Sequence, residues 1–140
     1  MLADESGRYA ALYRPIHMIG LELGISVASA ALRREPTGAP TGFHSDVAAT
    51  AKRALKRGEM LDGEGGYCVW GKQVPARRSL GAGLLPIGLA HGVRLRRDIA
   101  EGECLTWSDV ACDESEPAVK VRREMEAMFA QTIQAYSAAG

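Results

Sequence analysis

Apolar residues recur at spacings of three and four along residues 16–34, which is the period of an α-helix. Pro15 precedes this segment and suits the first turn of a helix. The segment is apolar on most of its circumference, so we expect a helix that is buried nearly all round. Gly20 and Gly24 lie four residues apart on it, and small residues at this spacing let another backbone approach closely. The prolines and glycines of residues 35–42 end the helix.

Frequent glycines divide residues 46–110 into short runs, as in a β-rich module with many turns. Residues 67–70 have the composition of a β-strand, and residues 93–96 have the strict alternation of one. The glycine-rich stretch at residues 62–66 leads into a strand-like run and not into a helix. We therefore expect a turn there and not a phosphate-binding loop.

Residues 116–136 return to helical spacing, with Pro117 in the first predicted turn. One face carries an apolar stripe, formed by Val121, Met125, Met128, Phe129, Thr132 and Tyr136. The opposite face is predicted to be solvated and carries Arg122, Arg123, Glu124 and Glu126. These patterns together predict an α+β fold in which two helices flank a β-rich module.

Two decapeptides, residues 52–61 (KRALKRGEML) and residues 96–105 (RRDIAEGECL), repeat one pattern 44 residues apart. The matching positions are a basic pair, an aliphatic residue (Leu55, Ile99), a glycine-glutamate pair (Gly58-Glu59, Gly102-Glu103) and a closing leucine. Each copy predicts a strand that ends at the basic pair and a turn in which glycine adopts a conformation closed to other residues. The copies indicate two equivalent corners related by an approximate two-fold axis. The alternative to such a symmetry is that a common strand-turn-strand sequence pattern occurs twice in the chain by chance.

Composition excludes several classes of protein. At 140 residues the chain is long enough for one ordinary core. Its 17 basic and 17 acidic residues cancel, which argues against nucleic acid and anionic membranes as partners. The longest apolar region, residues 16–32, is interrupted by polar residues and has no signal-peptide features, so a cytoplasmic protein is expected. The three cysteines lack C-x-x-C spacing, so we expect them reduced, with no disulfide and no zinc site.

Residues 95–110 (LRRDIAEGECLTWSDV) resemble the phrase found in SAF domains. These are β-clip modules named after sialic acid synthase, antifreeze proteins and the flagellar P-ring chaperone. More widely, residues 13–42, 61–72 and 84–99 resemble the C-terminal portion of a family of NAD(P)-dependent oxidoreductases. That family joins a homoserine-dehydrogenase-like Rossmann domain to a SAF module and includes deoxyxylulose-phosphate reductoisomerase-like enzymes. The resemblance covers residues 13–129.

The resemblance implies a SAF-like β-clip at residues 46–111, between a helical segment and a C-terminal amphipathic helix. Residues 1–45 would be the tail of a catalytic or substrate domain, and residues 112–140 the C-terminal helix. A Rossmann-type catalytic domain, in the same or a separate chain, would be the partner and would bind NAD(P). No G-x-G-x-x-G turn between a strand and a helix occurs before Tyr13. We therefore expect the isolated chain to bind no cofactor and to be inactive.

Two ionisable residues on the apolar first helix, His17 and Glu22, are candidate binding residues, and Arg14 is a third candidate close to them in the sequence. A charged group is expensive on an apolar surface unless it is paired or functional. Five residues apart, the two fall on different faces, which argues against a shared metal site. The simpler interpretation is that each is satisfied by a neighbouring backbone group or by Arg14.

Arg94 and Arg96 alternate with apolar residues, so both guanidinium groups are expected on one side of a strand. There they would bind a carboxylate or phosphate group, with His91 as a further candidate. The alternative for the two arginines is that they lie on a solvated strand face, and the alternative for His91 is that it is a turn residue. His44 and Asp46 have the spacing of metal ligands but lack a third partner, so no metal site is predicted. No arrangement typical of nucleophilic catalysis stands out, and no catalytic residue is assigned.

These observations favour the C-terminal, SAF-containing part of an NAD(P)-dependent oxidoreductase, which helps to close the substrate site or to assemble subunits. One alternative is a stand-alone module that binds a sugar acid or similar anion. Another is a structural oligomerisation domain. Both helices carry apolar stripes that one small domain has limited surface to cover, so we expect a homo-oligomer.

Overall fold

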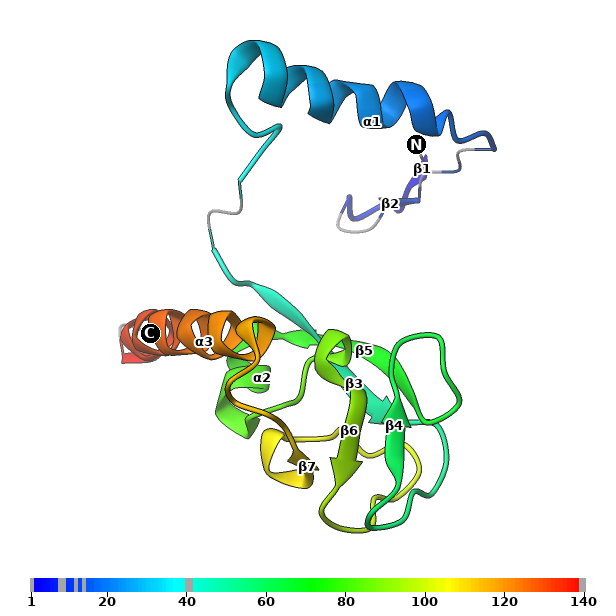
Figure 1. Cartoon of the computed structure of the whole chain (residues 1–140). Coiled ribbons are helices and arrows are strands. Elements are labelled where there is room, and N and C mark those ends of the chain that lie inside the picture. The colour runs from blue at the N-terminus through cyan, green and yellow to red at the C-terminus, as the bar shows by residue number, and fades with distance from the viewer. Residues whose placement is uncertain (1, 8–9, 12, 14, 40–41, 139–140) are drawn as a thin grey trace. The chain divides into compact units, whose positions relative to one another are not determined.

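The structure is a computed structural model. It describes residues 2–7, 10, 11, 13, 15–39 and 42–138, apart from the side chains of Leu2 and of residues 131–138. The chain divides into two units, Met1–Thr41 and Gly42–Gly140 (Figure 1). The C-terminal helix therefore belongs to the same unit as the β-rich module. The division between the two units falls after residue 41, four residues before the boundary predicted between residues 45 and 46.

The first unit contains a short hairpin and one helix. Strands β1 (Leu2–Ala3) and β2 (Ala10–Ala11) pair antiparallel. Helix α1 (Ile19–Ala28) continues into a π-helical turn, Ser29–Arg33, which ends where Arg34 adopts a left-handed conformation with φ 57°. The helix was predicted to start near residue 16. Pro15 lies outside it, and Met18 is its N-cap.

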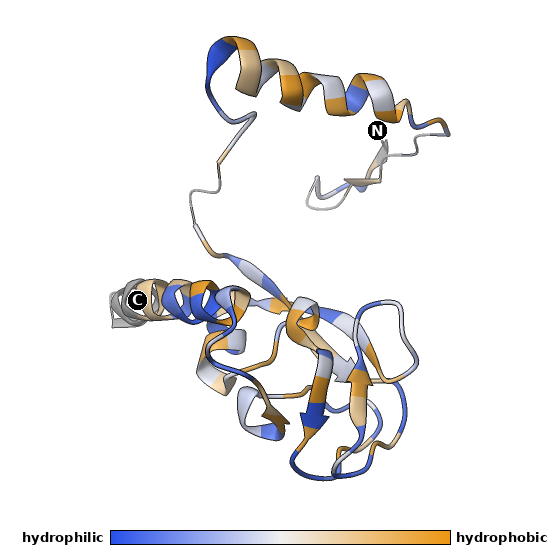
Figure 2. Cartoon of the chain, viewed as in Figure 1, coloured by the Kyte–Doolittle hydropathy of each residue, from blue (hydrophilic) through white to orange (hydrophobic). Residues whose placement is uncertain are grey.

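No residue of α1 is buried, although apolar residues recur along the helix (Figure 2). Leu21, Leu23 and Ile25 are each more than 60 % exposed. Within the first unit, the described residues supply nothing that covers this helix, so the prediction that it is buried nearly all round is wrong for this unit by itself. An added Cβ at Gly20 or Gly24 would likewise meet no atom within 4 Å.

The second unit holds two antiparallel sheets. Strands β3 (Ser45–Ala51) and β5 (Val69–Pro75) pair over seven residues. Strands β4 (Met60–Asp62), β6 (His91–Leu95) and β7 (Val110–Ala111) form the other sheet in the order β4-β6-β7. The helices are α2 (Ala76–Ala82) and α3 (Pro117–Ala138), with 3₁₀ turns at Ile87–Leu89 and Trp107–Asp109. This arrangement of helices and antiparallel sheets is an α+β fold, as predicted.

The two copies of the repeat form equivalent corners. Leu55 and Ile99 occupy the same place in each copy, and each donates its backbone N–H to the carbonyl oxygen of the other, at 2.9 and 3.0 Å. Such reciprocal contacts between equivalent residues are the signature of a two-fold relation. An approximate two-fold axis therefore passes between these residues, and both side chains are buried in the core.

The glycine of each corner has the predicted left-handed backbone. The φ angles are +83° at Gly58 and +77° at Gly102. Gly58 donates its N–H to the carbonyl of Leu95 at 2.8 Å, and Gly102 donates to the carbonyl of Ala51 at 2.9 Å. Leu95 ends β6, which leads into the second copy, and Ala51 ends β3, which leads into the first. The glycine of each corner is thus hydrogen-bonded to the strand that precedes the other copy.

The ion pairs of the corners repeat as well. Arg53 pairs with Glu59 in the first copy, and Arg97 pairs with Glu103 at 2.6 Å in the second. The hydrogen bond from each arginine lowers the pKa of its glutamate. In each copy of the repeat, the second residue of the basic pair therefore forms an ion pair with the glutamate of the Gly-Glu pair. A phrase repeated by chance would not place both copies around a common axis.

The glycine-rich stretch at residues 62–66 is a turn, as predicted. The Asp62 carboxylate accepts the backbone N–H groups of Tyr67 at 2.5 Å and Cys68 at 3.0 Å, and these hydrogen bonds lower its pKa. A Cβ at Gly66 would lie 2.2 Å from the Asp62 carboxyl carbon, so only glycine fits there. The stretch leads into β5 and does not open a helix.

Helix α3 packs through a face that we predicted to be solvated. The side chains of Arg122 and Glu126 are each only 13 % exposed, whereas Val121 and Met128 of the predicted apolar stripe are 66 % and 68 % exposed. Phe129 does face inward and meets the ring of Phe43 at 5.9 Å. The prediction is corrected for Arg122 and Glu126: the helix meets its own module through these charged groups as well as through Val119 and Phe129, and part of its apolar stripe is exposed.

Candidate functional site

A hollow of about 350 Å³ opens beside β6, between that strand and the start of α3. Its wall on one side is the segment from Gly88 to Val93, and on the other the segment from Ala111 to Val119. Four polar side chains line it: His91, Cys112, Asp113 and Glu116. This volume is within the range of small-molecule sites. Among the candidates predicted from the sequence, His91 is the one that lies here.

A β-bulge positions His91. Met60 pairs with Arg94 and Asp62 pairs with His91, so β6 uses one more residue than β4 between these pairs. Gly92 takes up the extra residue with φ +68°, and glycine in the left-handed region is typical of such bulges. The bulge bends β6 and changes the direction of its side chains. The residues of β6 that pair with β7 are Arg94 and Leu95, so the edge of β6 from His91 to Val93 is left to the hollow.

A backbone contact sets the tautomer of His91. Its Nδ1 lies 3.1 Å from the carbonyl oxygen of Asp62. A carbonyl oxygen only accepts, so Nδ1 carries the proton, and in the neutral ring Nε2 is left as a hydrogen-bond acceptor. A Cβ at Gly63 would come within 2.9 Å of the His91 Cβ, so glycine at that position makes room for the imidazole.

The opposite wall carries carboxylates. Asp113 accepts the backbone N–H of Ser115 at 2.8 Å, and hydrogen bonds from the Ser115 side chain and backbone lower the pKa of Asp113. Glu116 is exposed and precedes the first residue of α3. Cys112 is half-buried, and burial raises the pKa of its thiol, so it is a neutral thiol at pH 7. Cys68, Cys104 and Cys112 are all free, as predicted.

The two predicted arginines do not converge on this hollow. Arg94 donates from Nη1 to the carbonyl of Gly58 at 3.1 Å, and Arg96 donates from Nε to the carbonyl of Val110 at 2.9 Å. Arg96 lines a separate hollow of about 60 Å³, which it shares with Glu114. The structure thus brings His91 together with carboxylates and not with guanidinium groups.

The candidates in the first unit lie near one another. His17 precedes α1, and its Nδ1 is 3.7 Å from a carboxylate oxygen of Glu22, although the helical spacing had placed them on different faces. Both are partly exposed, at 70 % and 36 % of the side chain. Arg14, the third predicted residue of this group, lies outside the described residues. The described part of the chain holds no group of three or more residues suited to a metal ion.

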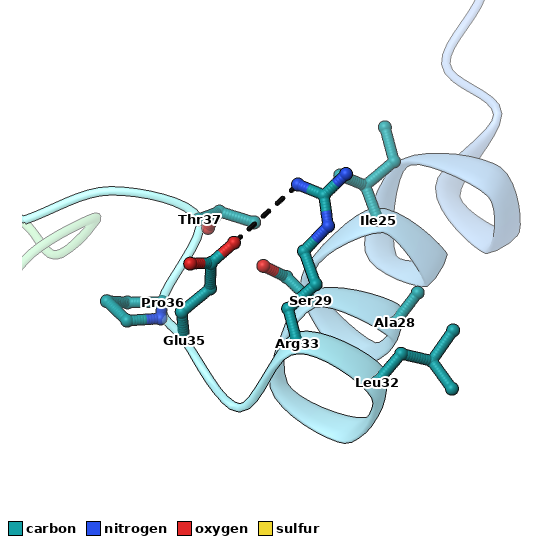
Figure 3. Close-up of a pocket in the computed structure, with 8 residues that line it drawn as sticks. All are labelled: Ile25, Ala28, Ser29, Leu32, Arg33, Glu35, Pro36 and Thr37. Carbon is teal, nitrogen blue, oxygen red and sulfur yellow. Dashed lines mark ion pairs between the residues drawn. The ribbon is translucent and has the colours of Figure 1, made fainter.

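The first unit also has an open hollow of about 510 Å³ at the C-terminal end of α1. Ile25, Ala28 and Leu32 form its apolar side (Figure 3). Arg33 and Glu35 face one another across the following turn, at 3.6 Å. π-Helical turns such as the one at Ser29–Arg33 are frequent at functional sites, but the two charged groups here are paired with each other.

Sequence reasoning missed one buried charged cluster. Arg122 donates to both carboxylate oxygens of Asp46, at 2.5 and 3.2 Å, and Ser79 donates to Asp46 at 2.5 Å. Arg122 also donates to Glu126 at 2.8 Å, and the indole N–H of Trp107 reaches the same carboxylate at 3.2 Å. Burial raises the pKa of Asp46, but the hydrogen bonds from Arg122 and Ser79 outweigh it and leave the pKa below its usual value.

This cluster holds the structure together and is not a binding site. Every charged oxygen of Asp46 has a protein partner, and the described residues contain no buried side-chain nitrogen or oxygen without a hydrogen bond. No signal in the sequence could have paired Asp46 with Arg122, because 76 residues separate them.

Compared with models of known protein families and with curated proteins, the chain matches none. In the part of the chain that the structure describes, no helix is both long enough and apolar enough to cross a membrane.

Proposed function

We propose that this chain is the C-terminal, SAF-containing part of a cytoplasmic NAD(P)-dependent oxidoreductase. The second unit is the SAF-like module, and the first unit docks onto a Rossmann-type catalytic domain in the same or a separate chain. One observation carries this proposal: α1 is strongly apolar, yet none of its residues is buried. Leaving the five large apolar side chains of α1 in water is costly, at about 1.5 to 3 kcal/mol for each one that a partner would bury.

The division of the chain supports this assignment of roles. The second unit has its own core, in which Leu55, Leu61, Leu85 and Ile99 are fully or almost fully buried. The first unit has one buried residue among those described, Ser29. A unit without a core needs a partner, and the resemblance of residues 13–42 to the family indicates which one. In this proposal the catalytic domain binds the nicotinamide cofactor, since the glycine-rich turn at residues 62–66 joins two strands.

The test is complementation. A homoserine-dehydrogenase-like oxidoreductase of the resembling family, truncated before its counterpart of Tyr13, is co-expressed with the full 140-residue chain. We expect a 1:1 complex on size-exclusion chromatography. The catalytic domain in this complex should be soluble and should bind NADPH, and nicotinamide fluorescence measures that binding.

A matched pair of variants locates the contact. Leu23→Glu places a charge on the exposed face of α1 and should abolish the complex. Val121→Glu places the same charge at a similarly exposed position on α3 and should leave the complex intact. The proposal fails if the unmodified chain forms no complex, or if both variants bind equally well.

A further inference from the structure

We infer that the hollow beside β6 is a binding site for a small organic cation, a primary ammonium or guanidinium group on a short apolar body. The inference concerns the second unit alone and does not depend on the proposed oxidoreductase. It differs from the anion site expected from the sequence, because the side chains brought together here are acceptors.

Apart from the Cys112 thiol, the polar side chains of the hollow share one character: they offer hydrogen-bond acceptors. Asp113 and Glu116 are carboxylates, which only accept hydrogen bonds when ionised. The Asp62 carbonyl holds the proton of His91 on Nδ1, so Nε2 of the neutral ring is an acceptor too. An ammonium carries three donors and a guanidinium carries five, with a positive charge in either case. A ligand of this class satisfies several acceptors at once.

The charge balance also favours a cation. The hollow lies at the N-terminal end of α3, where the helix dipole contributes roughly half a positive charge. The nearby charges of Arg96 and Glu114 act on Cys112 in opposite directions. Asp113 and Glu116 add about two negative charges, so the carboxylates dominate. Acidic residues before α3 stabilise the N-terminal end of the helix, which is one reason for them to occur there. That effect does not explain why they line the same hollow as His91, which the β-bulge positions.

The apolar part of the hollow sets the size of the ligand. Leu89 and Val93 are half-buried and pack against the core, and Val119 is 7 % exposed. An added Cβ at Gly88 or Gly92 would meet nothing within 4 Å, so the space beside both glycines is open. A volume of about 350 Å³ accommodates a chain of a few methylene groups beside the charged head.

The test uses three small probes of different charge: the dication agmatine, which carries both an ammonium and a guanidinium group, the monocation n-butylamine and the anion butyrate. Each is titrated into the ¹⁵N-labelled full chain, and amide shifts are followed by NMR. We expect saturable shifts at Gly88, Gly92 and Ala118 with agmatine and butylamine, and none with butyrate. Butyrate binding at these amides, or no saturation with either cation, would overturn the inference.

Variants separate a built site from general attraction to acidic side chains. Glu116→Gln and Asp113→Asn each remove one charge and should weaken binding about threefold or more. Asn at position 113 can still accept the hydrogen bond from Ser115. Glu101→Gln removes an exposed charge outside the hollow and should leave the affinity unchanged. Equal weakening by all three variants would show attraction by net charge alone, and the site would be dismissed.

Discussion

Individual residues carry most of what the sequence predicted correctly. The repeat identified Gly58 and Gly102 as positions with a special backbone, and both have positive φ. It also placed Leu55 and Ile99 as equivalent anchors, which prove to bond with one another across the two-fold axis. These features are local and occur twice, so the pattern itself contains the evidence. His91 was identified as a candidate, but its acidic neighbours come from a segment more than 20 residues later and could not be foreseen.

At this scale we predict that Gly58→Ala and Gly102→Ala each destabilise the fold by about 1 to 2 kcal/mol. An added Cβ at either glycine meets no atom within 4 Å, so the whole effect comes from the left-handed backbone. Urea unfolding of each variant measures the loss of stability. Gly81→Ala is the matched control, because Gly81 lies in α2 with equal free space and should be neutral or stabilising. Overlapping curves for all four proteins would show that the corners do not require glycine.

Among the elements, the start of α3 was predicted better than the faces of α1 and α3, whereas α2 and β3 were not predicted individually. Helix α3 begins at Pro117, as expected, yet its inward face includes two charged residues. Hydrophobic periodicity ranks faces by apolar content. It cannot anticipate that a buried Asp46 on β3 selects the face that carries Arg122. The burial of α1 was misjudged for a related reason, since periodicity tells which residues need covering and not whether the chain itself covers them.

The cluster at Asp46 leads to a prediction for α3. Arg122→Gln leaves the buried carboxylate without its cation and should cost about 3 kcal/mol of unfolding free energy, the lower end for broken buried pairs. Arg123→Gln, one residue along and exposed, should cost less than about 1 kcal/mol. Thermal or urea unfolding at pH 7 compares them. If the two variants are equally stable, Arg122 does not hold the helix.

The same cluster predicts a dependence on pH. The pKa of Asp46 is lower in the folded state than its ordinary value, so its contribution to stability is complete above that value, near pH 4. The contribution is lost as the pH falls through the folded-state pKa. The stability gap between the wild type and Arg122→Gln should therefore be constant from pH 5 to 7 and shrink below about pH 4. A gap that widens in acid would contradict this assignment.

At the scale of the whole molecule, the two units differ in what they need. The second unit buries its own core, whereas the first presents an apolar helix, and no nucleotide-binding turn accompanies either among the described residues. We therefore predict that the isolated chain binds neither NAD(H) nor NADP(H) with micromolar affinity. Isothermal titration calorimetry with all four forms checks it. Micromolar binding of any of them would mean that the turn at residues 62–66 holds a phosphate group after all.

The apolar helix also predicts how the chain behaves without a partner. Exposed apolar patches larger than a few hundred Å² are rare on monomers, and α1 offers Leu21, Leu23, Ile25 and Val27 in succession. Copies of the isolated chain should therefore associate through α1, most simply as a two-fold dimer. Sedimentation equilibrium at micromolar concentration should give a mass above 15.0 kDa, which Leu23→Glu returns to the monomer value. Val121→Glu tests α3 in the same way and should leave the mass unchanged. A wild-type monomer would mean that α1 stays exposed without cost, and the docking role proposed for it would lose its basis.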